Sequence, residues 1–336
     1  MSRTIQRPLT ALLILYASFP LCASPQPQAS ASRPAIEWQS PIGREHPLTG
    51  RIWEVATQGF IDEQRLLNTL ATIPYVITGE SHNNPDHHQL QLRILKALFA
   101  QGRRVSVGLE IFTSDDQPAL ERFSRSLHQN AEQLPEALNW SQRRRQQWGG
   151  YQRLIQFAAD AGLPLAAMDL SRREAASVRL YGLEVLPEEL VKRFRLDSPL
   201  PPKRQETLLR DMSKAHCGLP VSGNLEGMAL AQRTRDATMS ERLQRADVGG
   251  GTLLLVGYGH ARSDRGVPYL LDDITREGKL VSLLFASVKP SLTQPTDYRR
   301  WFGGETLPFD YVWFTPRVDD EDPCERLLRL YRKPKE

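Results

Sequence analysis

Apolar and polar positions along the chain follow two periods, one typical of buried strands and one of amphipathic helices. The run Tyr75-Val76-Ile77 is short and continuously apolar, as expected for a strand of a parallel sheet that is buried on both faces. Gly79 ends this run, and Asn84-Pro85-Asp86 then supplies an N-cap, a proline for the first turn and an acid at a helix start. Apolar residues repeat at helical spacing as far as Gly102, which predicts a helix through Leu90, Ile94, Leu95 and Leu98.

This alternation of strand and helix continues toward the end of the chain. Further apolar runs predict strands at 105–109, 164–168, 252–256, 280–288 and 311–314. Helical patterns lie over 52–70, 114–123 and 150–161. We therefore predict an α/β fold with a largely parallel sheet flanked by helices.

The alternation stops between residues 171 and 248. That segment is charged and contains helical patterns at 183–195, 205–215 and 225–245, so we expect a helical subdomain inserted into the sheet core. Residues 24–50 are rich in proline, serine, alanine and glutamine, which predicts a poorly ordered leader. The folded body is then expected over 51–320, with a C-terminal tail at 321–336.

Residues 1–23 have the pattern of a secretory signal peptide. Arg3 and Arg7 precede an apolar stretch from residue 9 to residue 21, and Leu21-Cys22-Ala23 supplies a cleavage site. The stretch is too short and too interrupted to span a bilayer. Cys22 also allows attachment as a lipoprotein, although Phe19-Pro20-Leu21 matches poorly the small residues that this processing prefers. We expect export to the periplasm.

Composition adds two constraints. The 336 residues are 40% hydrophobic and can bury one large core or two smaller ones, while the net charge of +4 is too small and too dispersed to predict a nucleic-acid partner. If Cys22 is lost with the signal, Cys217 and Cys324 remain, and their spacing is not that of a metal site. In an oxidising compartment, a disulfide between them and two separate buried thiols both fit.

Acids and histidines stand where several of the predicted strands end. Glu80 and His82 follow the first strand, Glu110 the second and His260 the fourth, while Asp169 ends the third. The carboxyl ends of parallel strands meet at one edge of the sheet, where open α/β folds bind their ligands. Each residue alone has a structural explanation, such as capping a helix, but their coincidence predicts a crevice that binds a ligand.

Two acids and two histidines in one crevice suit two kinds of chemistry. They could hold a divalent metal that activates water, or they could act as general acid and base without a metal. The sequence contains no nucleophile elbow, no Gly-rich phosphate loop and no HExxH helix. The adjacent His87 and His88 point in different directions on a helix, so we do not expect them to share one ion.

The segment from Trp140 to Tyr151 places three consecutive arginines, the last of them Arg145, between Trp140 and Trp148. One interpretation is a solvated basic loop that its aromatic residues anchor to the body. The other is a surface for a flat aromatic ligand with carboxylates, which the tryptophans would stack against and the arginines would pair with.

These motifs resemble those of the ChaN-like haem-binding uptake family, which is grouped with the erythromycin esterases and Tiki-type proteins. GESHNNPDHHQLQLRILKAL resembles the opening signature of this family, GLEIFTSDDQPAL its second motif and GYGHARSDRGVPYLL its late histidine motif. The segments AQRTRDATMS (231–240) and PFDYVWFTPR (308–317) are similar to family segments as well. The resemblance extends from about Tyr75 to Arg317.

The resemblance implies an exported, iron-regulated protein that binds haem at the crevice. It implies Tyr151 as the ligand of the haem iron, with His260 as the alternative, because an anionic phenolate oxygen suits ferric haem. Acids and histidines of the same motifs serve hydrolysis in the esterase relatives, and these positions are here Glu80, His82, Glu110 and His260. The residues expected around haem are Tyr151, His260, His82, Tyr258, Trp148 and Arg145.

We therefore predict a haem-binding protein, and not primarily an enzyme, that assists iron acquisition in a Gram-negative bacterium. The alternative is a hydrolase, with or without a divalent metal, that uses the four Glu and His side chains. The resemblance also allows an outer-membrane haem receptor or a periplasmic haem carrier as partner, and a homodimer. Lipid attachment through Cys22 would place the protein at the outer membrane.

Overall fold

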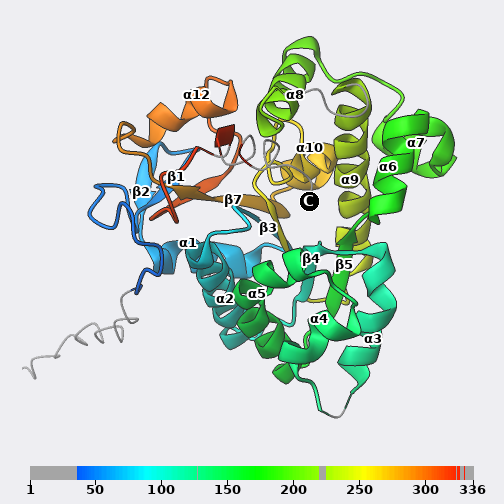
Figure 1. The fold of residues 1–336 in the computed structure, drawn as a ribbon. Helices are drawn as coiled ribbons and strands as arrows, with labels where there is room; N and C mark the ends of the chain where they lie inside the picture. The colour runs from blue at the N-terminus through cyan, green and yellow to red at the C-terminus, as the bar shows by residue number, and fades with distance from the viewer. Residues whose placement is uncertain (1–35, 127, 219–224, 323, 326–328, 330–336) are drawn as a thin grey trace, which may run out of the picture. The chain divides into compact units, whose positions relative to one another are not determined.

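The computed structural model describes residues 36–126, 128–218, 225–322, 324, 325 and 329, without the side chains of residues 142–147 and 274. Residues 37–336 form one unit, built on an eight-stranded sheet of order β2-β1-β8-β7-β3-β6-β4-β5 (Figure 1). The short strands β1 and β2 pair antiparallel at one edge. The other strands run parallel, which confirms the predicted α/β class: β3 (Tyr75–Glu80), β4 (Ser106–Thr113), β5 (Leu165–Asp169), β6 (Thr252–Gly257), β7 (Leu280–Ser287) and β8 (Tyr311–Thr315).

Helices cover both faces of the sheet (Figure 1). One group packs together on one face: α1 (Glu63–Thr72), α2 (Pro85–Ala100) and α5 (Gln142–Asp160). On the opposite face lies α9 (Leu225–Arg245), which packs against α6 (Arg172–Tyr181), α8 (Pro202–Ala215) and α10 (Val267–Leu270). The shorter helices are α3 (Gln117–Arg125), α4 (Leu134–Ala137), α7 (Glu188–Phe194), α11 (Asp272–Arg276) and α12 (Arg299–Phe302).

The predicted strand-to-helix unit around β3 and α2 is present as the local sequence indicates. The side chain of Asn84 accepts a hydrogen bond from the backbone N–H of Asp86 at 2.9 Å, and Pro85 occupies the first helical position. The helix ends at Ala100, and Gly102 adopts a φ of 83°, which glycine reaches without steric cost. The Asn84 cap thus fixes where the loop that carries His82 ends and α2 begins.

The helical pattern predicted over 52–70 is wrong in its first half. Residues Ile52–Glu54 form β1 and Gly59–Ile61 form β2, joined by a turn in which Gln58 has a φ of 50°. The helix starts only after Asp62, whose carboxylate accepts from the backbone N–H of Arg65. Pairing with β8, which lies far away in the sequence, holds these residues in an extended conformation.

The folded unit starts earlier than predicted. Residues 24–35 of the expected leader, like the expected signal peptide at 1–23, lie outside the described residues. However, Ser40 and Leu48 are fully buried, and Ile42 forms a bridge with Arg317. The backbone N–H groups of Gln39 and Ser40 donate to the Asp86 carboxylate at 2.7 and 3.0 Å. The segment after residue 36 therefore belongs to the folded body.

The expected helical insertion is occupied by α6 to α9 and by a 3-10 turn at Gly182–Val185. Its last helix, α9, has the predicted bounds. Ala237, Met239 and Leu243 of this helix lie in one hydrophobic cluster with Ile77 and Leu254 of the sheet. The insertion therefore shares the core of the main body, and α9 brings its polar side chains to the carboxyl ends of the strands.

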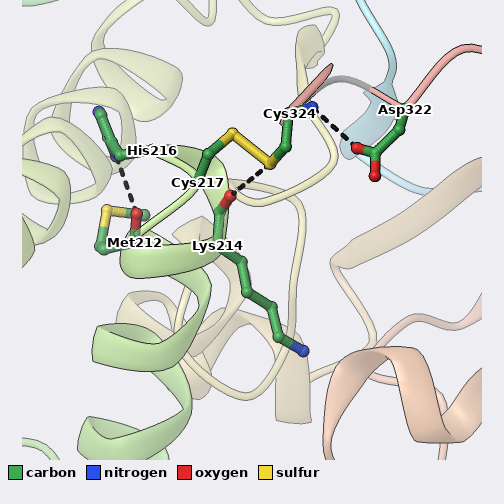
Figure 2. The surroundings of a disulfide bond; sticks show 6 residues. All are labelled: Met212, Lys214, His216, Cys217, Asp322 and Cys324. Atoms are coloured by element: carbon green, nitrogen blue, oxygen red, sulfur yellow. Dashed lines mark hydrogen bonds between the residues drawn. A yellow bond between two sulfur atoms is a disulfide. The ribbon is translucent and has the colours of Figure 1, made fainter. Parts of the chain in front are cut away.

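Cys217 and Cys324 form a disulfide, one of the two arrangements that the sequence allowed (Figure 2). The bond joins the end of α8 to the C-terminal segment, over a sequence separation of 107 residues. Beside it, the backbone N–H of Cys324 donates to Asp322 at 2.8 Å. In the part of the chain that the structure describes, no helix has the length and apolar character needed to cross a membrane.

Candidate functional site

The structure brings Glu80, His82, Glu110 and His260 together at the carboxyl ends of three adjacent strands. β6 lies between β3 and β4, so Glu80 at the end of β3, Glu110 within β4 and the histidines that follow β3 and β6 meet at one edge. Nδ1 of His82 lies 2.8 Å from Oε1 of Glu80, and Nε2 of His260 lies 3.2 Å from Oε1 of Glu110. Nε2 of His82 lies 3.9 Å from Oε2 of Glu110 and connects the two pairs.

Glu80 is the buried centre of the first pair. Its Oε1 accepts from His82 and from the hydroxyl of Tyr151, and its Oε2 accepts from the Gln91 amide at 2.7 Å and lies 3.3 Å from His88. Burial alone would raise the pKa of Glu80. The neighbouring His88 and His82 lower it by more, so that this pKa lies below its usual range. The carboxylate therefore stays ionised inside the protein.

His82 is the partly open member of this pair, with 37% of its side chain exposed. Burial lowers the pKa of His82, but the hydrogen bond to Glu80 and the negative charge of Glu110 raise it more, to about 9. On the Nε2 side lies Gly257, where a β-carbon would come within 3.0 Å of this nitrogen. Glycine at that position leaves space beside the imidazole.

His260 lies between two carboxylates in the second pair. Its Nδ1 lies 2.6 Å from Oδ1 of Asp236, opposite the contact of Nε2 with Glu110. Burial lowers the pKa of His260, but Glu110 and Asp236 together raise it to about 9. Burial likewise raises the pKa of Glu110, while His260 and Arg235 lower it well below the usual range. The imidazolium is thus held by two negative charges.

Arg235 of α9 links Glu110 to Asp169 at the end of β5. Its Nε and Nη2 bind the Asp169 carboxylate at 2.8 and 2.6 Å, and Nη2 also donates to Glu110 at 2.6 Å. Sequence reasoning gave no role to Arg235, Asp236 or Gln91. A signal for all three existed, because Arg235 and Asp236 lie in the segment 231–240 and Gln91 in the opening signature that resemble the family.

A cavity of about 370 Å³ opens beside these groups. His82, Glu110 and Arg235 line its polar side, together with Arg172 at the first position of α6. Trp140, Ile111 and Leu170 supply apolar surface. This size lies within the usual range for small-molecule pockets, which combine apolar walls with a few polar groups.

The predicted basic loop between Trp140 and Tyr151 is helical from Gln142 onward, because α5 starts there. Trp140 and Trp148 are both buried, with their ring centroids 5.5 Å apart, and both pack against Phe112. Trp148 is thus part of the aromatic core, while Trp140 reaches the cavity wall. The side chain of Arg145 lies outside the described residues.

The two predicted iron ligands lie at the site, but their polar atoms bind other side chains. Tyr151 is 1% exposed and donates its hydroxyl to Glu80, and burial together with Glu80 raises its pKa well above the usual value. His260 is 4% exposed, with both ring nitrogens near carboxylates. Tyr258 is 42% exposed, but it packs against Phe302 and does not line the cavity. The assignment of Tyr151 or His260 to the iron stays a prediction.

The divalent-metal alternative gains no support from the geometry. Among the residues whose positions are described, no three His, Cys, Asp or Glu side chains are grouped so that they could hold a metal ion. The adjacent His87 and His88 diverge, as expected: His87 contacts Thr315 at 3.0 Å, and His88 faces Glu80.

Comparison with known proteins finds one family that matches the sequence and a solved structure with a similar fold. The family model described as haem-binding uptake, Tiki superfamily, ChaN matches residues 66–271. A structure of cofacial haem binding to ChaN of Campylobacter jejuni shares 22% identity and a TM-score of 0.57, covering 78% of this chain and 95% of its own. At this identity the likeness supports the fold alone.

Two more distant structures have lower scores. A mutant of the erythromycin esterase EreC in its open conformation has a TM-score of 0.45 at 13% identity, over 86% of this chain and 100% of its own. The toxin effector domain RRSP of Vibrio vulnificus has a TM-score of 0.42 at 18% identity, over 71% and 37%. No curated protein matches the chain.

Proposed function

The chain belongs to the haem-binding uptake (ChaN) family of the Tiki superfamily, and on this premise we propose that it binds haem at the crevice beside His82 and serves iron acquisition. The observation that carries the proposal is the family match over residues 66–271. This range contains the four Glu and His residues of the site, together with Tyr151 and Arg235. The range that matches the family and the residues of the crevice therefore coincide in the sequence.

The side chains around the cavity fit a porphyrin with carboxylates. Trp140, Ile111 and Leu170 offer apolar surface to the macrocycle. His82 offers an imidazole, which is a common ligand of haem iron. Arg172 is exposed at the cavity and forms no ion pair with any residue of the described ranges, so its guanidinium is free to bind a propionate.

Titration of the purified apoprotein with haemin tests this proposal. We expect a saturable shift of the Soret band and quenching of tryptophan fluorescence, because Trp140 lies at the cavity wall. A titration without saturation, or one equal to that of an unrelated protein of similar charge, would contradict haem binding.

We also propose export to the periplasm of a Gram-negative bacterium. The signal-like pattern of residues 1–23 supports this, and so does the Cys217–Cys324 disulfide, because such bonds persist in oxidising compartments. Fractionation of cells that produce the full chain should place the processed protein in the periplasm or at the outer membrane. The variant Cys22→Ser distinguishes lipid attachment from simple cleavage, and unprocessed protein in the cytoplasm would contradict export.

A second candidate function is hydrolysis, favoured by the geometry of His82 and Glu80. A buried carboxylate at 2.8 Å holds a partly exposed imidazole, as in enzymes in which an acid orients a general base. Because the pKa of His82 is about 9, its imidazole would act as a base mainly at alkaline pH. Hydrolysis of an ester panel should then increase toward pH 9 and disappear in His82→Gln, and a wild-type protein that is inactive throughout would exclude this function.

A further inference from the structure

Strand β5 forms one outer edge of the eight-stranded sheet (Figure 1). It pairs in parallel with β4, and the backbone N–H of Val107 in β4 donates to the carbonyl of Pro164 at 2.8 Å. In a parallel ladder, the residues between those that bond to the neighbouring strand direct their N–H and C=O groups away from it. Leu165, Ala167 and Asp169 therefore present their backbone groups along the free edge of the sheet.

Side chains occupy only a part of this edge. The backbone N–H of Ala167 donates to Oε1 of Gln117 at 2.9 Å. Nη1 of Arg242 donates to the carbonyls of Ala167 and Asp169 at 3.4 and 2.7 Å. Within the described residues, the N–H and C=O of Leu165 have no such partner. Unpaired backbone groups of an edge strand are a template for a further extended chain.

Two cavities lie along the same edge. The larger, of about 420 Å³, is beside Ala167 and is lined by Arg242 and Arg245 of α9. The other, of about 380 Å³, is beside Leu165. Gln117 lines both cavities, so the edge of β5 is open on either side of this one amide.

We propose that the edge of β5 docks an extended peptide with acidic side chains, which adds to the sheet as a further strand. In strand addition, main-chain hydrogen bonds supply affinity, and every second side chain enters a pocket beside the edge. The backbone of Leu165 and the two cavities supply these two elements. The proposed peptide site lies at the edge of the sheet and does not depend on haem binding.

The charge of the larger cavity selects acidic side chains. Its described lining contains Arg242 and Arg245 and no carboxylate. The side chain of Arg245 is 73% exposed, and its ion pair with Glu241 is a surface pair that a carboxylate of the peptide can replace at little cost. Guanidinium groups bind carboxylates through paired hydrogen bonds, so a glutamate or aspartate of the peptide fits this cavity.

Gln117 occupies the position that a carbonyl of the peptide would take. Its Oε1 accepts from the N–H of Ala167, as a main-chain oxygen of an added strand would. Gln117 is the first residue of α3, and its amide otherwise donates to the exposed Glu121 at 3.3 Å. The side chain can therefore turn away without disturbing the helix, and the peptide restores the hydrogen bond that Ala167 loses.

A fluorescein-labelled hexapeptide of alternating valine and glutamate is the probe for this site. We expect its fluorescence anisotropy to rise saturably with the concentration of the full chain. The same peptide with lysine in place of glutamate should bind at least about fivefold more weakly. A peptide methylated at every backbone nitrogen should not bind, because it can donate no main-chain hydrogen bond. Equal binding of the methylated peptide would overturn strand addition.

Variants of Gln117 and Arg245 locate the binding. Gln117→Ala frees the N–H of Ala167 and should tighten binding about threefold to tenfold, the worth of one hydrogen bond, whereas Gln117→Glu keeps an acceptor, adds negative charge and should weaken binding. Arg245→Gln should weaken binding about fivefold. Arg276→Gln is its control, since it removes an exposed arginine outside both cavity linings. If Gln117 and Arg245 only cap the edge, all four variants bind the peptide like the wild type, which contradicts the proposal.

Hydrogen exchange of the wild type makes the test independent of the folding of any variant. Bound peptide should slow exchange of the backbone N–H of Leu165, because this group then donates to the added strand. Peptide binding that leaves Leu165 unprotected would overturn the assignment to β5. Protection of Leu165 without peptide, in a protein that sedimentation shows to be a dimer, would identify a second copy of the chain as the occupant and overturn the proposal as well.

Discussion

Gly150 of α5 lies directly against His88 of α2, so closely that a β-carbon at position 150 would overlap the imidazole. The ring of His88 also lies beside that of Tyr151, with centroids 4.2 Å apart, and both side chains contact Glu80. The absence of a side chain at Gly150 thus lets two helices approach each other around the carboxylate that holds His82.

Gly150→Ala should therefore lower the free energy of unfolding by about 1–3 kcal/mol, because the overlap outweighs the helix propensity gained with alanine. Gly149→Ala is the matched control, since its β-carbon would have nothing within 4 Å. That change should raise the free energy of unfolding by about 0.5–1 kcal/mol. Urea unfolding measures both, and equal stability of the two variants would contradict the close contact.

Arg235→Gln should destabilise the fold by about 2–4 kcal/mol, because Asp169 and Glu110 would lose the cation that both of them bind. The estimate is reduced from that for a fully buried pair because a quarter of the Arg235 side chain is exposed. Arg245→Gln in the same helix removes only an exposed pair with Glu241 and should change stability by less than about 0.5 kcal/mol. Thermal or urea unfolding compares the two, and similar losses would argue against the role of Arg235 in the site.

His87 should make the protein less stable as the pH falls below about 6.5. Burial lowers the pKa of His87 to about 3, so between these pH values the unfolded chain binds a proton that the folded chain does not. The free energy of unfolding then decreases by up to about 1.4 kcal/mol per pH unit for this group.

His87→Gln removes that titration and should give a shallower decrease between pH 6.5 and pH 5 in urea unfolding. The pH range from 6.5 to 5 separates His87 from His82 and His260. The raised pKa values of those two histidines act in the opposite direction, because the stability from their positive charges is lost as the pH rises toward 9. A variant with the same pH dependence as the wild type would show that His87 is not the responsible group.

Arg172→Ala should weaken haemin binding about fivefold, as expected for one partly exposed ion pair with a propionate. Arg173→Ala is the control, because this residue follows in the same helix and is exposed but does not line the cavity. Haemin dimethyl ester, which lacks the free carboxylates, should bind the wild type and Arg172→Ala equally. If Arg173→Ala weakens binding as much, the effect is one of general charge and not of a specific contact.

The sequence by itself determined the parallel strands, the main helices and the position of chemistry at the strand ends. β3, β6 and α2 could be predicted because continuous apolar runs, the Asn84 cap and the Gly102 stop act over a few neighbouring residues. Glu80, Glu110 and His260 were found in the same way, since each stands at the end of an apolar run or shortly after it. That these residues would share one sheet edge followed from the parallel class of the fold.

Tertiary structure alone decided which of these groups meet and which remain open. The order β3-β6-β4 places His82 near Glu110. From α9, Arg235 reaches Glu110 over a sequence separation of 125 residues, and Asp236 reaches His260. The β1–β2 hairpin likewise depends on β8, so its local pattern misled the helix prediction. The hydroxyl of Tyr151 binds Glu80, and His82 stays partly exposed at the cavity, because burial and hydrogen bonding depend on contacts between distant segments.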